Sequence, residues 1–274
     1  MKSKSEDIGN RIKENYENIT RMFIPRRTYT IIRLDGRAFH KFTKKFKKPY
    51  DLDFMRMMDE TAIELCKQIQ GAKCAFVQSD EINIVVTDFD ELKTNAWFDG
   101  NIQKIASISA SIATSAFNKS YLEHVIENET IDCSIKSMDL EHVSFAHFDS
   151  RVFSISDYNE VINVFVWRQI DATKNAIQML GRAHFSHKEL HGLSGQEIQY
   201  KLMTEKSINF NDQPIGFRRG RLIKQMKFMK QVGNECEVAR TKWESTEPDI
   251  FSKNKKELTD IIPLLNGYVQ DKDN

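Results

Sequence analysis

The hairpin signal in residues 74–87 constrains the fold of this chain more than any other feature. Two short segments of apolar and β-branched residues, Cys74–Gln78 and Ile82–Thr87, are separated only by residues 79–81. A connection this short can join only antiparallel neighbours, so the two segments must pair with each other. The sequence therefore predicts an antiparallel β-hairpin at this point of the chain.

The segments around the hairpin place it in a larger pattern. The β-branched and aromatic segment Thr28–Leu34 ends at the turn signal Asp35-Gly36. Helical periodicity follows in 52–69 and again, after the hairpin, in about 100–117, and strand-like residues return before 155. This strand–helix–strand–strand–helix–strand order is that of the ferredoxin-like split unit. We therefore predict an α+β fold, a β-α-β-β-α-β antiparallel sheet with helices packed on it.

The rest of the chain adds helices and strands to this unit. The N-terminal residues 5–20 have apolar residues at helical spacing, which predicts an amphipathic helix. The acidic stretch 121–141 is predicted to be a solvated connection, and Asp149-Ser150 a turn between two short strands. A long helix is expected to begin after Ser156. Residues 215–243 are predicted to form strands.

The charge of the chain is balanced overall but uneven along the sequence. Lys and Arg number 40 against 39 Asp and Glu, which gives a net charge of +1 and removes any whole-molecule argument for an anionic partner. Yet Arg37–Lys48 and Arg218–Lys230 each contain six basic residues and no acid. Basic clusters interleaved with phenylalanines suit a nucleic-acid backbone, and a solvated lysine face is the alternative.

Nothing in the sequence points to a membrane or to secretion. The first thirty residues lack the apolar core of a signal peptide, and no apolar run approaches the ~20 residues of a membrane-spanning helix. The four cysteines form no C-x-x-C pair, and their simplest state is a reduced thiol. We expect a cytoplasmic protein without membrane contact.

Three carboxylates occupy positions that suit a metal site. Asp35 ends the first predicted strand, and Asp80 and Glu81 lie in the hairpin turn. In a ferredoxin-like sheet these strand ends are neighbours, so the carboxylates can converge. Hard oxygen ligands in small number are what Mg²⁺ requires, with water and substrate phosphates completing the octahedron. The alternative is that both motifs merely form turns.

These residues belong to sequence blocks that resemble the tRNA(His) guanylyltransferase superfamily. The resemblance implies a polymerase-like palm that adds nucleotides to the 5′ end of tRNA in the 3′-to-5′ direction, with ATP and GTP or other nucleoside triphosphates as substrates. It also implies two Mg²⁺ ions per active site and a homotetramer built as a dimer of dimers. The matching blocks, in family order, are Arg33-Leu34-Asp35-Gly36-Arg37-Ala38-Phe39-His40, Lys48-Pro49, Gln78-Ser79-Asp80-Glu81, Phe148-Asp149-Ser150-Arg151 and Trp167-Arg168-Gln169-Ile170-Asp171.

The resemblance assigns roles residue by residue. The metal ligands would be Asp35, the carbonyl of Gly36 and Asp80, with Glu81 as the third catalytic carboxylate supporting them. Nucleotide-binding residues would be Arg37, Ala38, Phe39, His40, Lys48, Ser79 and Lys104. Residues assigned more weakly to tRNA or phosphate contact are Arg151, Arg168, Asn175 and Lys206, together with Arg218 and Arg219 from the second basic run. The implied division of the chain is a palm-like catalytic core (1–140), the remainder of the catalytic domain (141–240) and a C-terminal extension (241–274).

The sequence departs from the guanylyltransferases proper at one block. Their H-I-N-N-L-Y-N motif reads Thr173-Lys174-Asn175-Ala176-Ile177 here, so only Asn175 matches. This resembles the bacterial and archaeal branch that repairs 5′-truncated tRNA against the opposite strand. Template-directed repair is therefore the leading prediction, and strict addition of G at position −1 of tRNA(His) is the alternative. From other classes, a nucleotidyl cyclase-like palm and a non-catalytic RNA-binding module stay open.

Overall fold

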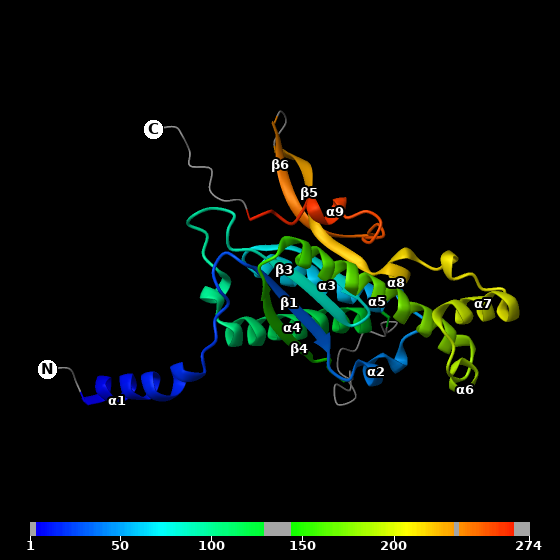
Figure 1. Cartoon of the computed structure of the whole chain (residues 1–274), viewed down its shortest axis with the longest axis horizontal. Coiled ribbons are helices and arrows are strands. Elements are labelled where there is room, and N and C mark those ends of the chain that lie inside the picture. The colour runs from blue at the N-terminus through cyan, green and yellow to red at the C-terminus, as the bar shows by residue number, and fades with distance from the viewer. Residues whose placement is uncertain (1–3, 129–143, 233–235, 266–274) are drawn as a thin grey trace.

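The computed structural model describes residues 4–128, 144–232 and 236–265, which form a six-stranded sheet with helices on both faces (Figure 1). All neighbouring strands are antiparallel, in the order β4-β1-β3-β2-β5-β6. The strands are β1 (Tyr29–Gly36), β2 (Ala72–Gln78), β3 (Glu81–Val86), β4 (Phe148–Ile155), β5 (Arg221–Val232) and β6 (Cys236–Thr246).

The predicted β-α-β-β-α-β order is confirmed. Helix α3 (Leu52–Gln68) connects β1 to β2, and α4 (Ile102–Asn128) connects β3 to β4. The first four strands take the order β4-β1-β3-β2, and the hairpin β5–β6 extends the sheet beyond β2 and projects from the body (Figure 1). The fold is α+β, as predicted.

The alternation of side chains along the strands gives the sheet two apolar faces. On one face, Ile32 and Ile84 are fully buried in the core that α3 and α4 complete. On the other, Ile31 and Val85 pack against α5 (Tyr158–His184). Beyond the sheet, α5 continues into a helical lobe made with α6 (His187–Leu190), α7 (Gly195–Lys206) and α8 (Ile215–Arg219). The remaining α-helices are α2 (Phe39–Phe42) and α9 (Lys256–Thr259).

The N-terminal segment extends away from the sheet (Figure 1). Helix α1 (Lys4–Ile12) continues through a π-helical turn and a 3₁₀ turn to Thr20, in agreement with the predicted amphipathic helix. Its apolar side chains are not covered by the described part of the chain. The exposed ones are Ile8, Ile12, Tyr16, Ile19, Met22 and Phe23.

Three local predictions are corrected. Asp149 and Ser150 do not form a turn but lie inside β4, because β4 pairs with β1 without interruption as far as Gly36. Helix α4 runs to Asn128, so the first residues of the predicted acidic connection are helical, and 129–141 lie outside the described residues. Residues 215–219 form α8 rather than strand. The predicted domain division stays a prediction, and β6 crosses its boundary at residue 240.

The described residues contain no helix that is long and apolar enough to cross a membrane.

Candidate active site

Four acidic residues, three on neighbouring strands and one in the hairpin turn, lie at one end of the sheet. Asp35 near the end of β1 is the register partner of Glu81 at the start of β3 and of Asp149 near the start of β4. Asp80 lies in the two-residue turn before Glu81, and its carbonyl accepts a hydrogen bond from the Gly36 amide at 3.0 Å. The predicted convergence of Asp35, Asp80 and Glu81 at neighbouring strand ends is therefore what the fold produces.

Asp149 is the carboxylate that the sequence argument missed. Its block was part of the family resemblance, but the Asp-Ser pair was interpreted as a turn. The signal that could have found it is the continuous alternation of β4, which places Asp149, Arg151 and Phe153 on the same face of the sheet as Asp35.

The two loops that carry the site hold unusual backbone. A Cβ at Gly36 would lie 2.3 Å from the Phe39 ring, so glycine leaves the room that this ring needs beside the backbone. Ser79 and Ala38 have φ values of 50° and 54°, in the left-handed region that residues with a side chain rarely adopt. Positive φ outside glycine tends to be retained where a site needs that geometry.

The electrostatics of Asp35 and Asp80 favour a bound cation. Burial, followed by the charges of Glu81 and Asp149, raises the pKa of Asp35 above its ordinary value. Burial also raises the pKa of Asp80, with Asp35 and Glu81 adding to the effect, although hydrogen bonds, including one from the Ser79 hydroxyl at 3.0 Å, oppose it. The two carboxylates thus repel each other and stand in a partly dry site.

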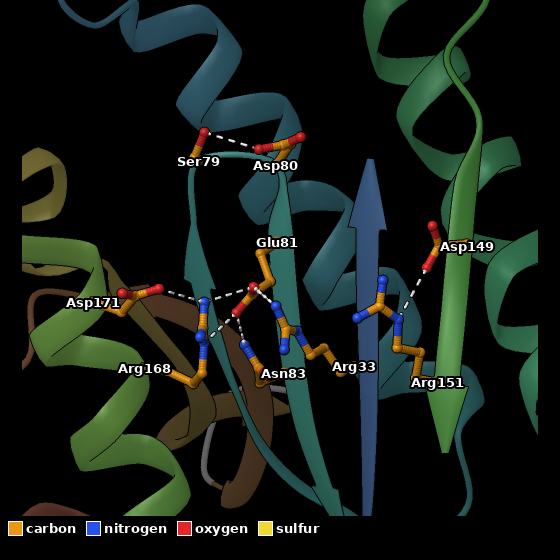
Figure 2. A network of polar contacts seen from close by, with 9 residues as sticks. All are labelled: Arg33, Ser79, Asp80, Glu81, Asn83, Asp149, Arg151, Arg168 and Asp171. Atoms are coloured by element: carbon orange, nitrogen blue, oxygen red, sulfur yellow. Dashed lines mark hydrogen bonds and ion pairs between the residues drawn. The ribbon is translucent and has the colours of Figure 1, made fainter. Parts of the chain in front are cut away.

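Glu81 has the opposite surroundings (Figure 2). Arg168 on α5 donates two hydrogen bonds to its carboxylate, at 2.6 and 2.7 Å, and Arg33 on β1 donates one at 2.7 Å. Asn83 donates another at 2.7 Å, and Arg168 also pairs with Asp171 at 3.2 Å. This buried network neutralises Glu81, so its role in the site would be structural support.

The network also corrects the expectation for Arg168. Its side chain is buried, and its guanidinium is bound to Glu81 and Asp171 rather than presented to RNA. The physical reason is that a buried carboxylate must be paired, and a planar guanidinium pairs with it bidentately.

The donor set at this end of the sheet fits Mg²⁺. Asp35, Asp80 and the Gly36 carbonyl offer hard oxygen atoms from two adjacent loops. Among the described residues neither carboxylate forms an ion pair, although the charges of Arg33 and Arg151, which pair with Glu81 and Asp149, partly oppose the rise in the pKa of Asp35. Within the described ranges, no three His, Cys, Asp or Glu side chains form a metal-binding group by themselves. Mg²⁺ does not need such a group, because one or two carboxylates with water and substrate phosphates suffice.

Several of the predicted nucleotide-binding residues adjoin these carboxylates in the sequence, since Arg37 to His40 follow Asp35 closely and Ser79 precedes Asp80. Arg37, Ala38, His40 and Lys48 are exposed in the segment after β1. The Phe39 ring is buried among other aromatic rings, so only its backbone can face a nucleotide. Ser79 borders a small cavity whose lining is largely apolar and aromatic, with Tyr50, Phe54, Met55, Ala176, Met179 and Phe217.

Lys104 is the exception, because it lies at the far end of the sheet. Its neighbour Ile105 lines a cavity with Thr30 and Val86, and these two residues pair five positions from the Asp35–Glu81 pair. Five residues of strand span about 17 Å. The expected contact between Lys104 and a triphosphate at Asp35 is therefore not supported within one chain, because α4 begins where β3 ends and not at the hairpin turn.

The weaker predicted contacts divide into exposed and engaged residues. Arg151 is exposed, 3.8 Å from Asp149, and Asn175 is exposed on α5 beside Ala176 of the apolar cavity. Lys206 ends α7, with its ammonium group 5.4 Å from the Phe185 ring centre. Arg218 is buried and donates to the Gln213 carbonyl at 2.8 Å, whereas Arg219 is partly exposed.

The two basic runs therefore differ. In the second run, Arg221 pairs with Asp59 at 2.5 Å and Lys224 with Glu257 at 2.6 Å. In the first run, all six cations are exposed and pair with no carboxylate among the described residues, although Lys45 donates a hydrogen bond to the Tyr121 hydroxyl.

Comparison with known proteins decides the family. The family model Thg1, tRNA(His) guanylyltransferase, matches residues 9–156, more than half of the chain. The chain belongs to the tRNA(His) guanylyltransferase family. It is accordingly a nucleotidyltransferase, and the non-catalytic RNA-binding module is set aside.

Relatives of this family match over most of their length. The uncharacterized protein R259 of Acanthamoeba polyphaga mimivirus is 30% identical over 230 residues, which cover 81% of this chain and 78% of that protein. The tRNA(His) guanylyltransferase of Schizosaccharomyces pombe is 27% identical over 95% of this chain and 92% of its own. A solved bacterial tRNA(His) guanylyltransferase-like protein in complex with ATP is 39% identical, with a TM-score of 0.80 over 94% of this chain and all of that one.

Proposed function

We propose that this member of the tRNA(His) guanylyltransferase family is a Mg²⁺-dependent 3′-to-5′ nucleotidyltransferase that repairs 5′-truncated tRNA against the opposite strand. The observation that carries the proposal is the pair Asp35 and Asp80, two mutually repelling carboxylates at neighbouring strand ends, neither of which forms an ion pair within the described part of the chain. The similar bacterial guanylyltransferase-like protein was solved with ATP and, in a second structure 36% identical to this chain, with GTP.

The reaction requires activation of the 5′ end before nucleotide addition. A 5′-monophosphate oxygen of the tRNA attacks the α-phosphorus of ATP, which forms an adenylylated 5′ end and releases pyrophosphate. The 3′-hydroxyl of the incoming nucleotide then attacks the 5′ phosphorus and releases AMP. Both steps are in-line transfers, so positioning and neutralisation of charge dominate catalysis.

Residues of this chain would provide both contributions. Asp35, Asp80 and the Gly36 carbonyl would hold two Mg²⁺ ions, which supply activation of the attacking oxygen and stabilisation of the leaving phosphate. Ser79 would keep the Asp80 carboxylate oriented through its hydroxyl. Arg37, two residues after Asp35, and Lys48 are exposed and would hold phosphate oxygens, and the apolar cavity beside Ser79 suits a nucleobase.

Two features favour general repair over strict guanylylation. Thr173 replaces the histidine of the family motif, and only Asn175 of that motif is kept on the exposed side of α5. The similarity is also higher to the bacterial guanylyltransferase-like protein, at 39%, than to the yeast enzyme, at 24% over 78% of this chain. Addition of G to position −1 of tRNA(His) is the alternative, and a nucleotidyl cyclase is the alternative from another class.

One incubation separates these functions. Purified protein, Mg²⁺, ATP and labelled nucleotides are combined with tRNAs of several kinds that lack one or more 5′ nucleotides. Repair predicts templated addition to each of them, whereas strict guanylylation predicts label only at position −1 of tRNA(His). A cyclase would release a cyclic nucleotide without RNA and would leave all tRNAs unlabelled.

The N-terminal arm supports the proposed homotetramer. Six large apolar side chains are exposed along this N-terminal segment (residues 8–23), and apolar surface gathered in one segment favours burial against another chain. The charges of α1 have both signs, which suits a protein surface better than RNA or an anionic membrane. Replacing Ile8 and Ile12 by glutamate should reduce the assembly size measured by light scattering, and an unchanged size would show that the arm is not the interface. A cytoplasmic location also stays a prediction.

A further inference from the structure

Trp167 has surroundings that packing alone does not explain. It lies on α5, directly before the buried Arg168, yet 53% of its surface is exposed. Below the indole, the Arg168 guanidinium carbon is 4.5 Å and that of Arg33 is 5.9 Å from the ring centre. Because Glu81 fixes both arginines by hydrogen bonds, the ring rests on a rigid layer. Part of the indole thus faces the protein while the rest stays open to solvent.

The surface beside Trp167 leads directly to the carboxylates. Arg33 is the register partner of Arg151 on β4, and the exposed positions of β4 on this side of the sheet are Asp149, Arg151 and Phe153. Phe153 is 39% exposed, so a second aromatic ring is accessible here. Arg33 precedes Asp35 by two residues of strand, about 7 Å, so the ring lies above a strand that ends at the carboxylates.

We infer that Trp167 is a stacking platform that holds a nucleobase beside the Asp35–Asp80 cluster, with Arg151 and Phe153 as the continuation of this surface. An indole backed by guanidinium groups attracts the face of any base, since stacking and cation–π contacts do not depend on base identity. Such sequence tolerance is what a templated repair enzyme needs. The inference rests on the proposed function for the identity of the ligand, but its test does not require catalysis.

The direct test uses Trp167 as its own fluorophore. The chain has three tryptophans, so Trp97→Phe combined with Trp243→Phe leaves Trp167 alone. A 5′-truncated tRNA transcript, ATP and GTP are each titrated separately, without Mg²⁺. Quenching by the tRNA assigns the platform to a base of the RNA, and quenching by ATP or GTP alone assigns it to the base of a nucleotide. If none of the three quenches the fluorescence, the inference is overturned.

Substitutions separate stacking from packing. Trp167→Leu keeps apolar cover over Arg168 but has no aromatic face, so the Kd of the ligand that quenches should rise about tenfold. Trp167→Phe should stay within about threefold of wild type, and Tyr200→Leu, at an even more exposed ring on α7, should leave the Kd unchanged. A purely structural role predicts that Trp167→Leu lowers the unfolding midpoint while the Kd stays constant, and that result would overturn the inference.

Failure of the proposed function would look different. If wild-type protein adds no nucleotide to any truncated tRNA but the transcript still quenches Trp167, the platform stands and the proposed repair activity falls.

Discussion

Asp80 and Glu81 are adjacent in the sequence but have opposite surroundings. Glu81 is enclosed by Arg33, Arg168 and Asn83, which satisfy its charge from three directions. Among the described residues, the side-chain hydrogen-bond partner of Asp80 is the Ser79 hydroxyl, and the nearby Asp35 repels it. The protein therefore pairs the Glu81 carboxylate with its own arginines, whereas Asp80 forms no ion pair among the described residues and is left for a bound cation. This difference separates a supporting residue from a ligand-binding one more clearly than residue type does.

The largest expected effect is on the rate of nucleotide addition when the Asp80 carboxylate is removed. Asp80→Asn keeps the shape of the side chain but removes the charge that would hold Mg²⁺. Metal stabilisation contributes several kcal/mol to such transfers, so single-turnover nucleotide addition should slow at least about a thousandfold. Asp99→Asn, an exposed acid at the far end of the sheet, is the matched control. Near-normal turnover in Asp80→Asn would remove Asp80 from the proposed metal site.

Removing an arginine partner of Glu81 should instead lower the free energy of unfolding. Arg168→Met leaves Glu81 with Arg33 and Asn83 only, and removing one partner of a buried ion pair costs about 3 kcal/mol. Urea unfolding should show this loss. Adding Glu81→Gln to Arg168→Met should restore part of the stability, because no buried carboxylate then lacks its partner. If the two effects simply add, Glu81 and Arg168 are not coupled.

The sequence predicted the position of Asp80 better than it predicted the ion pair of Glu81. Asp35 and Asp80 follow from strand ends and a hairpin turn, which are local signals, and the strand order brings them together. The Glu81–Arg168 pair joins residues 87 positions apart in the sequence, and it depends on how α5 crosses the sheet. No local pattern carries that information. The same holds for Lys104, whose family match says nothing about the end of the sheet at which α4 begins.

Local propensity also failed where pairing was stronger. Asp149-Ser150 has the composition of a turn, yet β1 offers it a continuous row of hydrogen-bonding partners up to Gly36. The long-range ladder therefore overrides the turn preference. As a result, an additional carboxylate joins the site, and its charge contributes to the raised pKa of Asp35.

A smaller effect should appear in the pH dependence of stability. The pKa of Asp80 is raised in the folded chain, so ionisation costs stability as the pH rises through that pKa, and the cost is absent below the ordinary carboxyl value of about 3.9. Without Mg²⁺, Asp80→Asn should therefore be more stable than wild type at pH 7, and the difference should shrink toward pH 4. Urea midpoints at both pH values measure it.

Mg²⁺ should make wild type more stable than Asp80→Asn at pH 7. A cation that binds only the folded state stabilises it by mass action, so Mg²⁺ should raise the unfolding midpoint of wild type but not of Asp80→Asn. A difference in unfolding midpoint between the two proteins that depends on neither pH nor Mg²⁺ would contradict the assignment of Asp80 as a metal ligand.

The smallest expected effect is on tRNA binding, and it compares an unpaired lysine with a paired one. Lys44 is exposed in the first basic run and pairs with no carboxylate in the described part of the chain, whereas Lys224 in the second run is bound to Glu257. An unpaired lysine near RNA releases about one counterion on binding. Lys44→Gln should therefore weaken tRNA binding severalfold and reduce the slope of log K against log salt by about 0.9. Lys224→Gln removes the same charge from the net total, yet it should leave both quantities unchanged, because its ammonium group already has a partner.

Filter binding of tRNA between 50 and 200 mM salt compares the two variants. Equal effects of the two substitutions would mean that net charge, and not the placement of unpaired cations, governs affinity for RNA.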